Sequence, residues 1–270
     1  MFGAIVGDIA GSRFEWRNIK TKEFELLPHN RHCRPTDDTV MTLAVAQAIL
    51  DCGGTWGELS RNAVKRMQEM GRKYPRAGYG GRFKRWISDD DPQPYNSWGN
   101  GAAMRVSACG FAAATLDEAK VLSAAVTRVT HDHPEGMKGA EATAAAIFLA
   151  RSGKSMDEIR EYVEANYYKL DFTLAEIRPA YSFDVSCQGS VPQAIEAFLE
   201  STGFEDAVRN AVSIGGDSDT IAAITGGIAE AYYGVPAEIR EAAAAFLYPD
   251  QLAVVNAFEA RYGIPTERNA

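Results

Sequence analysis

The sequence lacks any uninterrupted apolar stretch of the roughly 18 residues that a membrane-spanning helix needs. Its N-terminal segment, MFGAIVGDIAGSRFEW, carries Asp8 inside the apolar part and has no basic residues before it, unlike a secretory signal peptide. We therefore expect neither a membrane segment nor a signal peptide.

Basic residues are fewer than acidic ones: the chain has 28 lysines and arginines and 36 aspartates and glutamates, which gives a formal net charge of −8. Proteins that bind nucleic acid usually present a basic surface, so we do not expect a nucleic-acid partner. A small phosphate-bearing ligand remains compatible with this charge, because backbone N–H groups, a few arginines or metal ions can bind it locally.

Cysteine is scarce and scattered. The four cysteines at 33, 52, 109 and 187 form no Cys-x-x-Cys pair, which argues against a disulfide framework. A zinc site built on Cys33 and His32 would be a poor chelate, because neighbouring residues cannot easily bind one ion and no second pair is visible. Reduced thiols are typical of cytosolic proteins, and we expect a cytoplasmic location.

Alternating apolar and polar residues, the pattern of a β-strand, are nearly absent. Helix starts are abundant instead: TWGE (55–58), TLDE (115–118), SMDE (155–158) and TLAE (173–176) match the capping box. Glycines suited to the residue after a helix end stand at 53, 71, 153 and 234.

Small residues recur where helices would cross, as in GAEATAAAIFLA and in the glycines at 3, 7 and 11, and they let helix axes approach closely. We predict an all-α fold in which residues 1–270 form a single compact orthogonal bundle of about ten or more helices. The stretch from 73 to 100, rich in glycine, proline and aromatic residues, is expected to be a long loop, and such loops are often functional.

Two clusters of oxygen-bearing side chains open strongly apolar helical segments, one in PTDDTVMTLAVAQAIL and the other in IGGDSDTIAAITGG. One aspartate would suffice to cap each helix, whereas two neighbouring carboxylates repel each other unless a cation is bound. Mg²⁺ prefers oxygen ligands, and a two-metal site could form if the two helix starts meet. The predicted ligands are Thr36, Asp37, Asp38, Asp217, Asp219 and Thr220; the alternative is a pair of ordinary helix caps.

Two other motif interpretations fail. An EF-hand loop counted from Asp217 would place Ile221 and Ala222 where an acidic or amide residue and a glycine are needed. The haloacid-dehalogenase motif DxDx[TV] follows a hydrophobic strand, whereas here Thr220 comes one position early and glycines precede the aspartates.

Two further motifs complete the candidate site. In NSWGNGAAMRV (96–106) the glycines free backbone N–H groups at a helix start, which is a common anion-binding arrangement. In THDHPEG, His131 and Asp132 form an "HD" pair, as in all-α, metal-dependent HD-type phosphohydrolases, although the other ligands of that family are not evident.

Taken together, GAIVGDIAGSRFEW, TDDTVMTLAVA, NSWGNGAAMRV, THDHPEG, CQGSVPQAI and GGDSDTIAAITGGIAEAYYG resemble the ADP-ribosylglycohydrolases, the family of dinitrogenase reductase-activating glycohydrolase and the ADP-ribosyl-acceptor hydrolases. The motifs span nearly the whole chain. The resemblance implies an all-α fold, two divalent cations (Mg²⁺ or Mn²⁺) and hydrolysis of the ribosyl C1″ bond of an ADP-ribosylated protein or a small ADP-ribose conjugate.

The resemblance also assigns roles to individual residues. The six predicted ligands would hold the metal ions, while Glu15, Asp38 or Asp217 would orient water or act as general base. Substrate would contact His131 and the loop formed by Ser97, Trp98, Gly99, Asn100 and Gly101. A non-catalytic ADP-ribose-binding or crystallin-like relative and an HD-type phosphohydrolase remain as alternatives. The acceptor is not specified by the sequence, and we expect a monomer.

Overall fold

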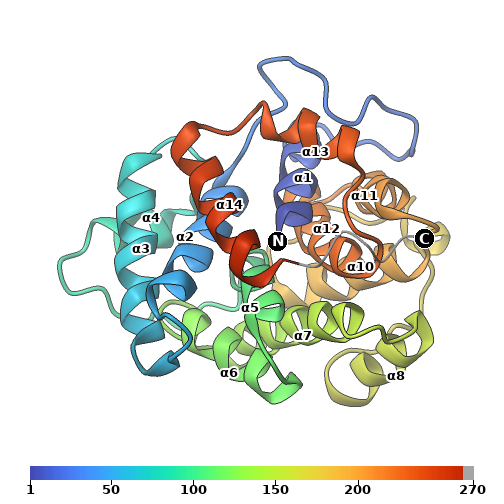
Figure 1. Cartoon of the computed structure of the whole chain (residues 1–270). Helices are drawn as coiled ribbons and strands as arrows, with labels where there is room; N and C mark the ends of the chain where they lie inside the picture. The colour runs from blue at the N-terminus through green and yellow to red at the C-terminus, as the bar shows by residue number, and fades with distance from the viewer. Residues whose placement is uncertain (264–270) are drawn as a thin grey trace.

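The computed structural model describes residues 1–263, which form fourteen α-helices, two short 3₁₀ helices and one isolated β-bridge between Gly99 and Ser186 (Figure 1). The predicted all-α fold is confirmed. In chain order the elements are α1 (Phe2–Gly11), α2 (Asp37–Asp51), η1 (Trp56–Glu58), α3 (Leu59–Lys73), α4 (Gly81–Ser88), η2 (Asn100–Ala102), α5 (Ser107–Ala112), α6 (Leu116–Thr127), α7 (Pro134–Arg151), α8 (Met156–Asn166), α9 (Leu174–Ile177), α10 (Cys187–Leu199), α11 (Phe204–Ser213), α12 (Ser218–Tyr233), α13 (Ala237–Ala244) and α14 (Pro249–Tyr262).

Several helix boundaries follow directly from the sequence signals. Full capping boxes form at Ser155 and Thr173, where the hydroxyl and the glutamate three residues later each accept a backbone N–H. Gly53 follows the last turn of α2 with φ of 62°, a conformation that favours glycine. The prediction is wrong at Thr55, whose side chain makes no capping bond and which precedes only η1.

The region around α3 and α4 differs from the prediction. Gly71 lies inside α3 rather than after it, and a Cβ there would be 2.7 Å from Cδ1 of Ile87. Its lack of a side chain lets α4 pack closely against α3. The stretch from 73 to 100, expected to be a long loop, contains α4 because Phe83, Trp86 and Ile87 fall on one buried face at helical spacing.

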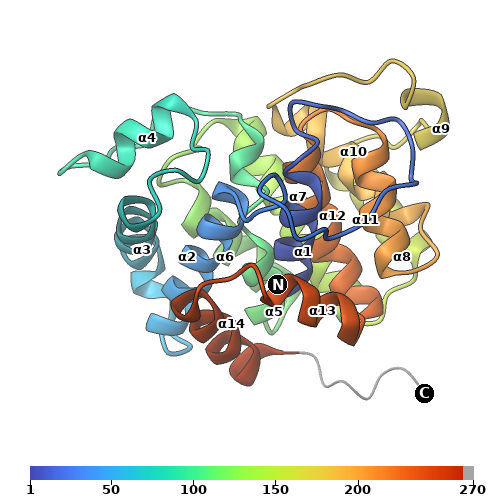
Figure 2. The ribbon, with the colours of Figure 1, turned by 90° about the horizontal axis from the view of Figure 1, so that it is seen from above.

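α1 lies in the middle of the molecule and α12 runs beside it, as Figures 1 and 2 both show. All ten residues of α1 are buried, and no pair of helices within residues 1–263 shares a larger contact. The axes approach closely because α1 presents glycines to its partner: a Cβ on Gly7 would stand 1.9 Å from the carbonyl oxygen of Ala222, and one on Gly11 would stand 2.5 Å from Cα of Asp219. This packing brings Asp8 of α1 to the start of α12.

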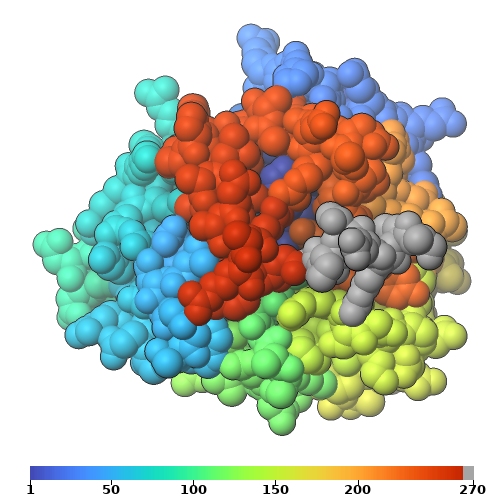
Figure 3. All heavy atoms as spheres, viewed as in Figure 1, coloured from blue at the N-terminus to red at the C-terminus, as the bar shows by residue number. Residues whose placement is uncertain are grey.

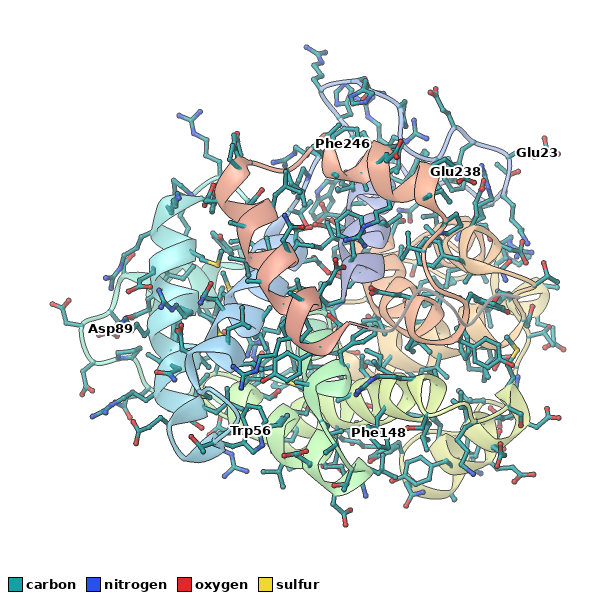
Figure 4. The ribbon with its side chains drawn as sticks, in the orientation of Figure 1. Glu23, Trp56, Asp89, Phe148, Glu238 and Phe246 are labelled. Atoms are coloured by element: carbon teal, nitrogen blue, oxygen red, sulfur yellow. The ribbon has the colours of Figure 1, made fainter. Side chains whose placement is uncertain are left out.

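Two long irregular segments extend from this helical core. One runs from the end of α1 to α2 and includes Glu23, and the other follows α4 and includes Asp89; the two labelled residues lie at opposite edges of the molecule in Figure 4. Across residues 1–263, every helix is too short or too polar to cross a bilayer.

Candidate metal and substrate site

The N-terminal ends of α2 and α12 lie against each other and bring the two acidic clusters together. The hydroxyl of Thr220 donates a hydrogen bond of 3.3 Å to Oδ2 of Asp38. Carboxylate oxygens form two overlapping groups, each with its atoms within 4.8 Å of one another: Asp8, Asp38 and Asp219 in the first, and Glu15, Asp217 and Asp219 in the second. Asp219 therefore stands where the two groups join.

Asp8 is the member of the site that the sequence interpretation missed. It is fully buried, and its carboxylate accepts hydrogen bonds from the backbone N–H and the hydroxyl of both Thr36 and Thr39. The Thr36 hydroxyl donates to Asp8 at 2.6 Å and accepts the backbone N–H of Asp38 at 3.3 Å, and Oδ2 of Asp38 also lies 3.3 Å from it. The signal in the sequence is an aspartate in the middle of the otherwise apolar segment GAIVGDIAG.

We expect Asp8→Asn to lower both stability and metal affinity. The amide NH₂ would face N–H and O–H donors that now bond to a carboxylate, leaving buried donors without acceptors at a cost of about 3 kcal/mol. Thermal unfolding and titration with Mg²⁺ would measure the two effects. Unchanged values for both would show that Asp8 does not hold Thr36 in place.

Negative charge in the cluster is not balanced by any basic side chain within hydrogen-bonding distance among the described residues. Burial, then the charge of Asp8, raises the pKa of Asp37 to about 7, and burial with the neighbouring carboxylates raises those of Asp38 and Asp219 well above the usual range. Oδ1 of Asp38 is buried and has no hydrogen-bond partner. An all-oxygen donor set with an unpartnered buried carboxylate oxygen fits a hard divalent cation.

These raised pKa values predict how the metal-free protein responds to pH. The unfolded chain titrates near pH 4, so the carboxyl groups favour folding below that pH and lose this contribution as the pH rises through about 7, the folded-state pKa of Asp37. In EDTA we expect the melting temperature to be roughly 5–10 °C lower at pH 8 than at pH 5. Excess Mg²⁺ should remove most of the difference, and an EDTA sample equally stable at both pH values would contradict the prediction.

A cleft of about 430 Å³ opens above the acidic cluster. Its lining includes residues of the acidic cluster, namely Glu15, Asp37, Asp38, Asp217, Asp219 and Thr220, and residues of two other motifs, namely Ser97, Gly99, Asn100, Gly101 and His131. The side-chain amide of Asn100 donates a 2.7 Å hydrogen bond to Oδ2 of Asp217, which joins the glycine turn to the acidic cluster. Thr36 lies buried beneath, and Trp98 is not among the lining residues; its ring is half-exposed and lies 5.4 Å from that of His133.

Glu15 is held over the cluster by Asn18. The side-chain amide of Asn18 donates to the carbonyl oxygens of Phe14 and Glu15 and also pairs with both the N–H and the C=O of Gly216, immediately before Asp217. Burial, then the charge of Asp217, raises the pKa of Glu15 to about 7. The turn that carries Glu15 is thus fastened to the turn that opens α12.

The chain is similar to known proteins over nearly its whole length. A sequence model of the ADP-ribosylglycohydrolase family matches residues 1–262. The chain belongs to the ADP-ribosylglycohydrolase family. It is 25% identical to ADP-ribosylhydrolase ARH3 of Gallus gallus, over 93% of this chain and 89% of that protein, and 26% identical to its Homo sapiens counterpart, over 86% and 84%. A solved ADP-ribosylglycohydrolase-related protein complex shares the fold, with a TM-score of 0.72 at 22% identity and coverage of 97% and 96%.

Family membership overturns the HD-type alternative, and the geometry agrees with this. His131 is buried and bonds through Nδ1 to the hydroxyl of Thr130, while Asp132 accepts the backbone N–H of Asn96. Neither residue belongs to a group of potential metal ligands in the part of the chain described.

Two aromatic residues at the cleft were not predicted. Trp16 and Phe183, from loops far apart in the sequence, stack with ring centroids 4.9 Å apart, and both line the cleft. Trp16 is 76% exposed. Of the aromatic residues in the 73–100 stretch, Phe83 and Tyr95 line the cleft, and Phe83 also stacks on Trp86 with ring centroids 5.4 Å apart.

A larger hollow of about 920 Å³ lies away from this site, among the end of α12, α13, α14 and the start of α8. Figure 3 shows the face formed by α13 and α14, with part of the N-terminal segment visible between them. The charged groups that line this hollow are paired, as in the ion pair between the Met1 ammonium and Glu230. Among residues 1–263 this hollow contains no cluster of potential metal ligands, so the cleft at the starts of α2 and α12 is the better candidate site.

Proposed function

We propose that this chain is a metal-dependent hydrolase that cleaves the ribosyl C1″ bond of ADP-ribosylated proteins or small ADP-ribose conjugates and releases ADP-ribose. The observation that most strongly supports this is the meeting of two acidic helix starts at a cleft that is also lined by a glycine turn. The family to which the chain belongs supports the class of substrate.

Two divalent cations, Mg²⁺ or Mn²⁺, would be held by the oxygen ligands of the two helix starts. Cations bound there would neutralise the carboxylates, orient the ribose hydroxyls and lower the pKa of a bound water. The proposed ligands are Thr36, Asp37, Asp38, Asp217, Asp219 and Thr220.

The residues of the chain supply the rest of the chemistry. Cleavage of the C1″ bond develops positive charge on the ribose ring, as in glycoside hydrolysis. Glu15 lines the cleft beside Asp217 and Asp219 and is the proposed general base that takes a proton from water. The glycine turn at 99–101 offers backbone N–H groups to a diphosphate.

A panel of ADP-ribosyl-arginine, ADP-ribosyl-serine, poly(ADP-ribose) and O-acetyl-ADP-ribose, each incubated with Mg²⁺ or with EDTA, tests the proposal. We expect release of ADP-ribose from at least one substrate with Mg²⁺ and none with EDTA. Binding of ADP-ribose without turnover of any substrate would instead indicate a non-catalytic relative.

A further inference from the structure

Arg105 is a buried cation without an acidic partner. Arg105 is 1% exposed, yet within residues 1–263 its side-chain hydrogen bonds go only to the carbonyl of Val126 (3.3 Å) and the hydroxyl of Thr130 (2.6 Å), and its Nε has no partner there. A buried charge that is not paired with an opposite charge is costly to the fold. Arg105 also borders the candidate cleft, which suggests that its cost is offset by a role there.

The bond from Arg105 determines where the proton of Thr130 goes. Since a guanidinium only donates, the Thr130 oxygen accepts from Arg105 and directs its own proton elsewhere. Two acceptors are within reach: the carbonyl of Thr127 at 3.4 Å and Nδ1 of His131 at 2.7 Å. The first distance is beyond a normal O–H···O bond and the second is ideal, so the proton points to Nδ1 of His131.

We propose that Arg105 and Thr130 are positioning residues that hold His131 as a neutral imidazole with its proton on Nε2, so that Nε2–H donates a hydrogen bond to an acceptor oxygen of the ligand bound over the glycine turn at 99–101. The identity of that ligand, ADP-ribose, rests on the proposed function. The positions of the protons on His131 and Thr130 rest on the geometry alone.

Nε2 of His131 faces the glycine turn. A Cβ added to Gly101 would lie 3.4 Å from Nε2 and one added to Gly99 would lie 3.6 Å from it. Within residues 1–263, Nε2 has no protein partner, while Nδ1 is occupied by Thr130. The Nε2–H group of neutral His131 is therefore directed at the cleft as a hydrogen-bond donor.

The surroundings keep His131 neutral. Burial, then the positive charge of Arg105, lowers its pKa well below the usual value. Tyr95, whose ring lies 5.8 Å from that of His131, carries no charge at neutral pH, and the neighbouring Asp132 bonds to Asn96 instead. A neutral imidazole offers one donor and one acceptor, and the bond at one nitrogen dictates the state of the other.

Nitrogen NMR of the full chain, labelled with ¹⁵N at its four histidines, tests the positioning without any ligand. We expect the His131 signals of the wild type at pH 7 to show a protonated Nε2 and an unprotonated Nδ1. Thr130→Val, which keeps the shape but loses the hydroxyl, and Arg105→Met should each give a mixture of tautomers, whereas Thr130→Ser should keep the wild-type pattern. A proton on Nδ1 in the wild type, or the same pattern in all four proteins, would overturn the proposal.

A double-mutant cycle on ADP-ribose binding tests the role of Nε2–H. Thr130→Val should raise the Kd about tenfold in the presence of His131, as expected for a lost hydrogen bond. In a His131→Phe background the same substitution should change the Kd less than about twofold. Equal effects in both backgrounds would show that Thr130 acts only through the fold and would overturn the proposed route through His131.

The two experiments separate this inference from the proposed function. If ADP-ribose does not bind to the wild type in the presence of Mg²⁺, the proposed function and its ligand fail, and the NMR experiment alone decides whether Arg105 and Thr130 position His131. If ADP-ribose binds but the tautomer is wrong, only the inference fails.

Discussion

Asp219→Asn is expected to abolish the binding of divalent cations and to reduce the release of ADP-ribose on the order of 10³-fold. Asp219 is the residue shared by both groups of converging carboxylates, so its loss removes a ligand atom from each. An amide keeps the shape of the side chain but not its charge. Titration with Mg²⁺ and the initial rate on the best substrate of the panel would measure the two effects.

Stability measurements distinguish a lost site from a lost fold. Because Asp219 is buried among other carboxylates that raise its pKa, the metal-free variant should be at least as stable as the metal-free wild type at pH 8. Asp117→Asn is a matched control, since this aspartate also stands in the first turn of a helix but its side chain is 94% exposed. Retention of metal binding and activity by Asp219→Asn would refute the proposed metal site.

Gly7→Ala is expected to lower the free energy of unfolding by about 3–5 kcal/mol or to prevent folding. The added methyl group would stand 1.9 Å from a carbonyl oxygen of α12, and backbone on both sides leaves no flexible side chain that could move away. Asp8, the next residue, would be displaced with the helix, so metal binding should weaken as well.

Gly57→Ala provides the control for this substitution. A Cβ at Gly57 meets nothing within 4 Å, and we expect it to change stability by less than about 0.5 kcal/mol. Chemical denaturation of both variants would measure the difference. Equal stability of the two variants would mean that the close contact of α1 with α12 is not required.

Local signals in the sequence were sufficient for the fold class and for much of the candidate site. Helix caps, alanine-rich runs and the lack of strand alternation predict an all-α protein because each depends on residues close in the sequence. The surplus carboxylates at Asp37 and Asp217 could be recognised because one acidic residue is enough to cap a helix.

The features that were missed depend on contacts between distant segments. Gly71 looks like a helix end until Ile87 is seen to occupy the space beside it. Asp8 gains its role from α2, and Trp16 gains its stacking partner from a loop more than half the chain away. Nothing in the sequence around Arg105 shows that it is buried without a counter-ion. Each depends on a tertiary neighbour that spacing along the chain does not reveal.

The packing of α1 against α12 has a consequence for how the protein is made. α1 is synthesised well before its partner, which begins only at Ser218. At ordinary rates of synthesis, roughly 10–40 s pass between the synthesis of α1 and the synthesis of α12. During that time a helix that is apolar apart from Asp8 lacks the native surface that covers it, so the nascent chain exposes it to other apolar surfaces. A chain that terminates before Ser218 lacks α12, and with it both the surface that covers α1 and the proposed ligands Asp219 and Thr220.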